Sequence, residues 1–191
     1  MKKNNQGFML VEALVMSTVI IGVLIFMFIQ FRNISRGYDK SFSYNSVPSL
    51  YYTNELKEYL ASDLTGHLLD LDDYFANEDA DYLFVVKYLE DKDEYLYFAE
   101  YNEETNEYEE LGIDYEEFED FVSYLGIKTA VVADEELTGL RGIYHKEFSE
   151  GLNDYINYVK TNGDSNRYRL VVEFLDDTYA SLSLGGDLNE E

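Results

Sequence analysis

The chain has 191 residues, a formal net charge of −25 at pH 7 and no cysteine. This length suits one folded domain with an appended segment. The charge argues against direct binding of nucleic acid, because phosphate contacts need clustered lysine and arginine. Without cysteine the chain has no disulfide, no thiolate chemistry and no cysteine-based zinc site. Aromatic residues make up 16% of the sequence, which argues against disorder, so we expect a folded acidic protein.

An apolar run of 22 residues extends from Phe8 to Ile29. The residues that interrupt its apolar character are Glu12, Ser17, Thr18 and Gly22. As a helix the run spans roughly 33 Å, which is enough to cross the hydrocarbon core of a bilayer. We expect the helix to continue to about Arg36 and to end at Gly37.

Glu12 decides between three interpretations of this run, because a carboxylate in a helix that faces lipid costs about 2–3 kcal/mol. A cleaved secretory signal has a shorter apolar region, followed by a cleavage site of small residues, and no such site follows here. A plain membrane anchor explains everything except Glu12. The third interpretation gives the glutamate a function.

The third interpretation is a family resemblance. The stretch resembles the type III signal of type IV pilins and of their pseudopilin relatives. In that family a short basic leader ends in glycine, phenylalanine follows, and glutamate is the fifth residue counted from that phenylalanine. Here the leader is residues 1–7 with Gly7 at its end, Phe8 follows, and Glu12 is fifth from Phe8. The resemblance covers the N-terminal helix, residues 8–36, and does not extend into the rest of the chain.

The resemblance implies processing and assembly. A prepilin peptidase would cut between Gly7 and Phe8 and methylate the new amino group of Phe8. In a filament, the Phe8 amino group of the same or a neighbouring subunit would neutralise Glu12 and fix the register of the helices, since purely apolar packing slides at low cost. The family topology also implies a cytoplasmic N-terminus and an extracytoplasmic head. Basic residues flank the run on both sides, so charge alone leaves the orientation open.

After this helix we predict a connector and an amphipathic helix in residues 37–62, followed by an acidic head in residues 63–191. The amphipathic helix is predicted from Pro48 to Ser62, because proline suits a first turn and apolar residues recur at helical spacing. Three β-branched and aromatic segments then predict an antiparallel meander. These are residues 82–89, 95–101 and 108–111.

In the second half of the head, the sequence pattern predicts two helices, a strand and a hairpin. The first helix begins after an N-cap at Asp114 and ends at Gly126, and the second ends at Asn162-Gly163. A short strand is predicted at residues 127–133. The hairpin comprises residues 168–175 and 178–184. The predicted fold class is therefore α+β, a long N-terminal transmembrane helix followed by a globular head with an antiparallel sheet and short helices, as in pilin-like proteins.

Residues that suggest catalysis or metal binding are few. His67 and His145 are the two histidines, and neither has a partner at the spacing of a metal site or a catalytic triad, so we predict both to be exposed to solvent. We predict no enzyme activity and no cofactor. Asp70, Asp72 and Asp73 are close enough in sequence to form a weak candidate calcium site, although they lack the spacing of an EF-hand loop.

These observations predict a pilin-like structural subunit, a minor pilin or pseudopilin, of a type IV pilus, competence or type II secretion-like filament. Its partners would be the prepilin peptidase and methylase, other pilin or pseudopilin subunits, and the membrane. It would be a single-pass protein of the cell membrane that can move into a surface filament. The alternative is a single-pass, membrane-anchored extracellular binding protein that does not polymerise, which would keep its first seven residues.

Overall fold

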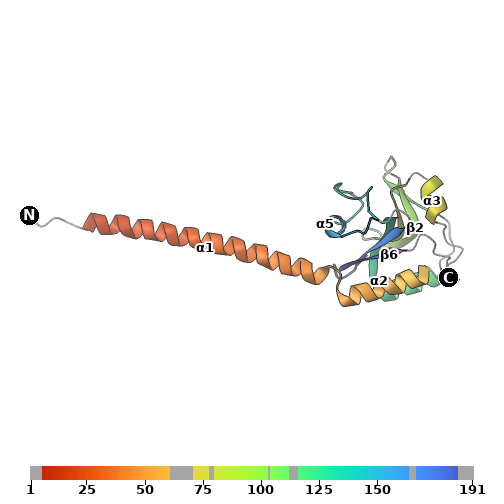
Figure 1. Ribbon diagram of the computed structural model, residues 1–191, viewed down its shortest axis with the longest axis horizontal. Coiled ribbons are helices and arrows are strands. Elements are labelled where there is room, and N and C mark those ends of the chain that lie inside the picture. Colours follow the sequence, from red (N-terminus) through yellow and green to blue (C-terminus); the bar gives the residue numbers. More distant parts are fainter. Residues whose placement is uncertain are drawn as a thin grey trace, which may run out of the picture. The chain divides into compact units, whose positions relative to one another are not determined.

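The computed structural model describes residues 6–60, 71–77, 80–102, 104–111, 116–163 and 167–184. The chain divides into two compact units, a helical unit (Met1–Phe42) and a head unit (Ser43–Glu191) (Figure 1). The helices are α1 (Gln6–Ser43), α2 (Val47–Leu60), α3 (Leu71–Asn77), α4 (Glu116–Leu125) and α5 (Glu150–Tyr158). The strands are β1 (Tyr82–Leu89), β2 (Glu94–Asn102), β3 (Glu107–Glu110), β4 (Ile127–Asp134), β5 (Tyr168–Phe174) and β6 (Tyr179–Leu184).

The long helix α1 continues beyond its predicted end. It passes through Gly37 and stops at Ser43, so the prediction of an end at Arg36 is wrong. A glycine inside a helix costs only about 1 kcal/mol relative to alanine, and no proline follows it before Pro48. The left-handed backbone that turns the chain is found at Asn45 instead, with φ of 54°.

The described strands form one six-stranded sheet in the order β3-β2-β1-β4-β5-β6, and every neighbouring pair is antiparallel. The predicted meander and the C-terminal hairpin are both present, and β1 has the predicted bounds. The expected α+β class, a long apolar helix followed by an antiparallel sheet and short helices, is confirmed at this level.

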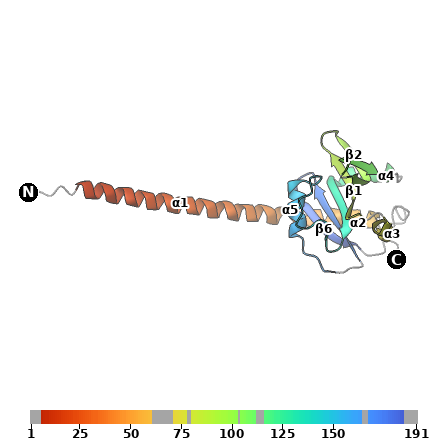
Figure 2. The ribbon, with the colours of Figure 1, turned by 90° about the horizontal axis from the view of Figure 1, so that it is seen from above.

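Helices cover both faces of the sheet, because its central strands carry apolar side chains on both sides. Val132 and Val172 pack in one core together with side chains from α2, α3 and α4. Val131 and Val171, their neighbours in sequence, pack in a second core together with α5. In Figures 1 and 2, α2 and α5 accordingly lie on different sides of β6.

The predicted helices of the head are present, but α3 was not predicted and α5 ends earlier than expected. The predicted apolar face of α4 packs in the first core, through Phe118, Phe121, Val122 and Leu125. Asp114, its predicted N-cap, lies outside the described residues. Helix α5 ends at Tyr158 rather than at Asn162-Gly163. Val159 leaves the helix with an extended ψ of 131°, while its amide N–H still donates to the Tyr155 carbonyl.

Both edge strands of the sheet are protected. Strand β3 has four residues, and three of them are glutamates. The outer side of β6 is covered by α2 and by Asn45 before it. The Asn45 amide donates to the Tyr179 carbonyl at 2.7 Å, and the ammonium of Lys57, in the last turn of α2, donates to the Ser183 carbonyl at 3.1 Å. Asn45 Oδ1 also accepts from the Ser181 amide at 3.4 Å.

Candidate functional site

Helix α1 carries the residues of the predicted processing and assembly site. Its segment Val11–Ser35 is 25 residues long, has a mean hydropathy of 2.5 and is not buried against other parts of the protein. By length and composition this segment can cross a bilayer. Gly7 and Phe8 lie in the first turn of α1, and Glu12 lies about one turn further on. The coarse prediction of a single N-terminal membrane-spanning helix is thus supported, and the orientation of that helix stays a prediction.

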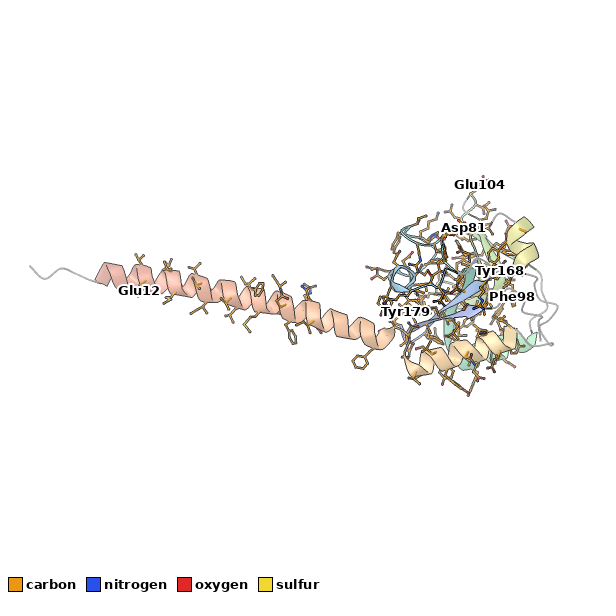
Figure 3. All side chains as sticks on the ribbon, viewed as in Figure 1. Glu12, Asp81, Phe98, Glu104, Tyr168 and Tyr179 are labelled. Carbon is orange, nitrogen blue, oxygen red and sulfur yellow. The ribbon has the colours of Figure 1, made fainter. Side chains whose placement is uncertain are left out.

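Glu12 is an exposed carboxylate in an apolar surrounding (Figure 3). Positions three, four and seven residues further along share its side of the helix. They are Val15, Met16 and Val19, which are 54%, 60% and 58% exposed. Among the described residues no side chain or backbone group forms a hydrogen bond or ion pair with the Glu12 carboxylate.

Ser17 and Thr18, the polar residues nearest to Glu12 in this segment, form hydrogen bonds within the helix. The Ser17 hydroxyl donates to the Leu14 carbonyl at 2.9 Å, and the Thr18 hydroxyl donates to the same carbonyl at 2.6 Å. Back-bonding of this kind lets serine and threonine sit in an apolar medium. Glu12 therefore differs from Ser17 and Thr18, because its charge needs a partner from outside the described chain.

His145 is buried, so the prediction that it is exposed is wrong. It is 9% exposed, and its Nδ1 lies 3.0 Å from Glu147 Oε1. The Tyr82 hydroxyl donates to the same carboxylate oxygen. The Asn153 side chain accepts from the His145 amide at 3.0 Å and donates to the His145 carbonyl at 2.9 Å. These bonds hold the loop before α5 against the sheet. His67 lies outside the described residues.

A pocket of about 320 Å³, with several charged side chains in its lining, lies beside this loop. Lys87, Lys128, Ser149 and Glu173 contribute to its lining. Burial lowers the pKa of Lys87, whereas a hydrogen bond with Glu90 raises the pKa of Lys128. Glu173 is 1% exposed and accepts a hydrogen bond from the Ser149 hydroxyl at 2.7 Å. Charges of both signs are therefore paired inside the pocket, and no nucleophile is set against a free base there.

A second pocket, of about 280 Å³, has a mainly apolar lining. Pro48 and Tyr52 of α2 line one side. Leu125 at the end of α4, and Phe174 and Leu175 at the end of β5, line the other. The sequence did not indicate this pocket, because its walls come from three segments that are far apart in the chain.

The predicted calcium site is not tested by the described side chains. Asp70 lies outside the described residues, and Asp72 and Asp73 fall within α3 with side chains that are also outside the description. Across the described ranges, no three histidine or carboxylate side chains are grouped so that they could hold a metal ion. Calcium binding at Asp70, Asp72 and Asp73 therefore stays a prediction.

Comparisons with protein-family models, with curated proteins and with solved structures give no match for this chain.

Proposed function

We propose that this chain is a pilin-like subunit, of the minor pilin or pseudopilin kind, which is processed at Gly7 and assembles through α1 into a filament. The observation that carries the proposal is the Glu12 carboxylate in an exposed apolar helix, five residues after Gly7, for which the described part of the chain offers no partner. Keeping this carboxylate in a helix that faces lipid costs about 2–3 kcal/mol. The cost is offset if the amino group that cleavage creates at Phe8 neutralises the carboxylate in the assembled state.

The first test measures processing. The full-length chain is co-expressed with a prepilin peptidase, and the product is examined by intact mass spectrometry. The expected product begins at a methylated Phe8. A catalytically inactive peptidase is the matched control and should leave the first seven residues in place. An unprocessed chain in the presence of the active peptidase contradicts the proposal.

The second test measures the contribution of Glu12 to assembly. Glu12→Val should be cleaved and inserted normally but should be lost from filaments, because the helix loses the charge that fixes its register. Ser17→Val is the matched control, since it also replaces a polar side chain of α1 whose hydrogen bond is internal to the helix. Normal incorporation of Glu12→Val would show that the carboxylate has no assembly function.

The alternative function, an anchored extracellular binding protein that does not polymerise, is favoured by the charge of the head unit. Residues 43–191 contain 37 acidic and nine basic side chains, so neighbouring heads repel one another. In this case the chain keeps residues 1–7 and stays a monomer in the membrane. The intact mass from the first test separates the two functions directly.

A further inference from the structure

Exposed apolar side chains gather around the apolar pocket of the head unit. We call these residues the α2 patch: Val47 (82% exposed), Tyr51 (59%), Tyr124 (81%) and Leu175 (53%). Val47 and Tyr51 lie one turn apart on α2, Tyr124 precedes the pocket residue Leu125, and Leu175 itself lines the pocket. Exposed apolar patches around a pocket are typical of interaction sites.

Two aromatic side chains, Tyr52 and Phe174, line the pocket. The rings of Tyr51 and Tyr52 meet edge to face with centroids 5.6 Å apart, and the rings of Tyr52 and Phe174 are 6.3 Å apart. A further ring placed in the pocket would extend this series, and aromatic pairs contribute about 0.5–1.5 kcal/mol beyond the area that they bury.

Carboxylates predominate around the α2 patch. The segments that form and border it, residues 47–58, 118–126 and 174–178, contain six of them: Glu55, Glu58, Glu119, Asp120, Asp176 and Asp177. Lys57 is the only basic residue of these segments, and its ammonium donates to the Ser183 carbonyl of β6. A partner for this surface should therefore combine an apolar side chain with positive charge.

The end of α1 has this combination. Phe42 is 77% exposed, and it follows the membrane segment, which ends at Ser35. Arg32, Arg36 and Lys40 recur every four residues, and Asp39 is the one acidic residue among them. This end of the helix is thus basic and aromatic, and its charge is complementary to that of the α2 patch.

We propose that the α2 patch of one copy binds the end of α1 of a second copy, with Phe42 in the apolar pocket and the net positive charge of residues 32–40 complementing the carboxylates around it. The contact uses different surfaces on the two copies, so it is heterologous and can repeat along a row of subunits. It also offsets part of the repulsion between acidic heads. The inference rests on the proposed assembly function and adds a second contact to the one at Glu12.

Disulfide cross-linking tests this contact, because the chain has no cysteine of its own. Full-length copies that carry only Ser43→Cys, next to Phe42 at the end of α1, are co-expressed with differently tagged copies that carry only Thr178→Cys, at the rim of the pocket, and membranes are mildly oxidised. Phe42 and Leu175 are unchanged in these copies, and the expected product is a mixed dimer that carries both tags. Tyr144→Cys replaces Thr178→Cys in the matched control, since Tyr144 is 67% exposed and lies outside the patch. The 43–178 product should exceed the 43–144 product about tenfold, because docking raises the effective concentration.

A surface variant tests whether the cross-link depends on the apolar pocket. Leu175→Glu, at a position 53% exposed, should leave the fold intact and abolish the 43–178 product when it is added to the copy with Thr178→Cys. Equal yields at positions 144 and 178 contradict the contact. A chain that is cleaved after Gly7 and assembles through Glu12 without the 43–178 product contradicts the patch contact alone. An uncleaved chain that gives the product contradicts the filament function alone.

Discussion

The side chain of Tyr179 leaves no room for a Cβ atom at Gly151. A Cβ atom at this position would lie 1.9 Å from the Tyr179 hydroxyl oxygen and 2.7 Å from Tyr179 Cζ. The Tyr179 ring cannot move away easily, because it packs against the rings of Tyr44 and Tyr155, at centroid distances of 5.7 and 5.5 Å. The first turn of α5 and the edge strand β6 therefore fit together only if position 151 is glycine.

We predict that Gly151→Ala lowers the free energy of unfolding by about 1–3 kcal/mol, the usual cost of overpacking, despite the better helix propensity of alanine. Urea unfolding of the full chain in detergent, followed by near-ultraviolet circular dichroism, measures this change. Combining Gly151→Ala with Tyr179→Phe should recover part of the loss, and Tyr179→Phe alone is the control for the missing hydroxyl. A double variant no more stable than Gly151→Ala would rule out this clash.

At the scale of elements, Asn45 joins α1, α2 and β6. Its backbone is left-handed, with φ of 54°, and its amide donates to the Tyr179 carbonyl. Its side-chain oxygen accepts a hydrogen bond from the Tyr155 hydroxyl at 2.7 Å. Asparagine suits both requirements, since it tolerates the left-handed region better than most residues and supplies an acceptor.

We predict that Asn45→Ala lowers the free energy of unfolding by about 2–3 kcal/mol. This is the sum of about 1–2 kcal/mol for the left-handed backbone and about 1 kcal/mol for the lost side-chain hydrogen bonds, mainly the one from Tyr155. Asn45→Gly loses only these hydrogen bonds, so it should be less destabilised than Asn45→Ala. Guanidinium unfolding of the three chains in the same detergent gives the comparison. Equal stability of the alanine and glycine variants contradicts the backbone contribution.

The sequence predicted the elements well where the pattern is local. The strands 82–89 and 168–174 have β-branched and aromatic runs that are bounded by turns, and the structure places both in the sheet. The burial of His145 depends on Tyr82 and Asn153, which come from other elements. The buried ion pair between Glu135 and Arg169 joins residues 34 apart in sequence. No local pattern contains such contacts.

The same distinction between local and distant contacts applies to the candidate site. Gly7, Phe8 and Glu12 could be proposed from the sequence because the resemblance depends on a short spacing along one helix, and their function stays a prediction. The apolar pocket was not predictable, because Pro48, Leu125 and Leu175 meet only after the sheet has formed. The end of α1 was misplaced because glycine is a statistical helix stop, whereas Asn45 ends this helix through contacts with β6.

At the scale of the whole molecule, buried tyrosines make the free energy of unfolding depend on pH in the alkaline range. Burial raises the pKa of Tyr155, Tyr179 and Tyr108 from 10.0 to about 12. Between these pH values the unfolded chain releases protons that the folded chain keeps. The stabilisation is therefore complete below pH 10 and is lost as the pH rises toward 12. The lowered pKa of Lys87 acts in the opposite direction, because it favours folding as the pH rises toward 10.5. Since one lysine opposes three tyrosines, the net effect of rising pH is destabilising.

We predict that the head unfolds cooperatively between pH 10 and pH 12, together with the late ionisation of these tyrosines. Tyrosinate absorbance and near-ultraviolet circular dichroism should change over the same pH range. Tyr124→Phe is the matched control, since this side chain is 81% exposed and should not affect the unfolding midpoint. Complete ionisation of tyrosine before any loss of structure contradicts the prediction.

The charge of the head unit predicts a strong dependence on salt. Its 37 acidic side chains against nine basic ones repel one another over a Debye length of about 30 Å at 0.01 M salt and about 8 Å at 0.15 M. The melting temperature should therefore rise with sodium chloride, by about 2–4 °C for each kcal/mol of repulsion removed. Glu104→Lys, in the exposed turn between β2 and β3 (Figure 3), should raise it at low salt only. A melting temperature independent of salt contradicts this prediction.

Both borders of the sheet, β3 with its glutamates and β6 under Asn45 and Lys57, are closed to a further strand. Proteins held side by side meet at high local concentration, a condition under which open strand edges recruit one another into amyloid-like stacks. The head disfavours such stacking. A strand of another molecule would meet negative charge at β3 and backbone groups that already form hydrogen bonds at β6. Crowding can therefore bring heads close together without joining their sheets edge to edge.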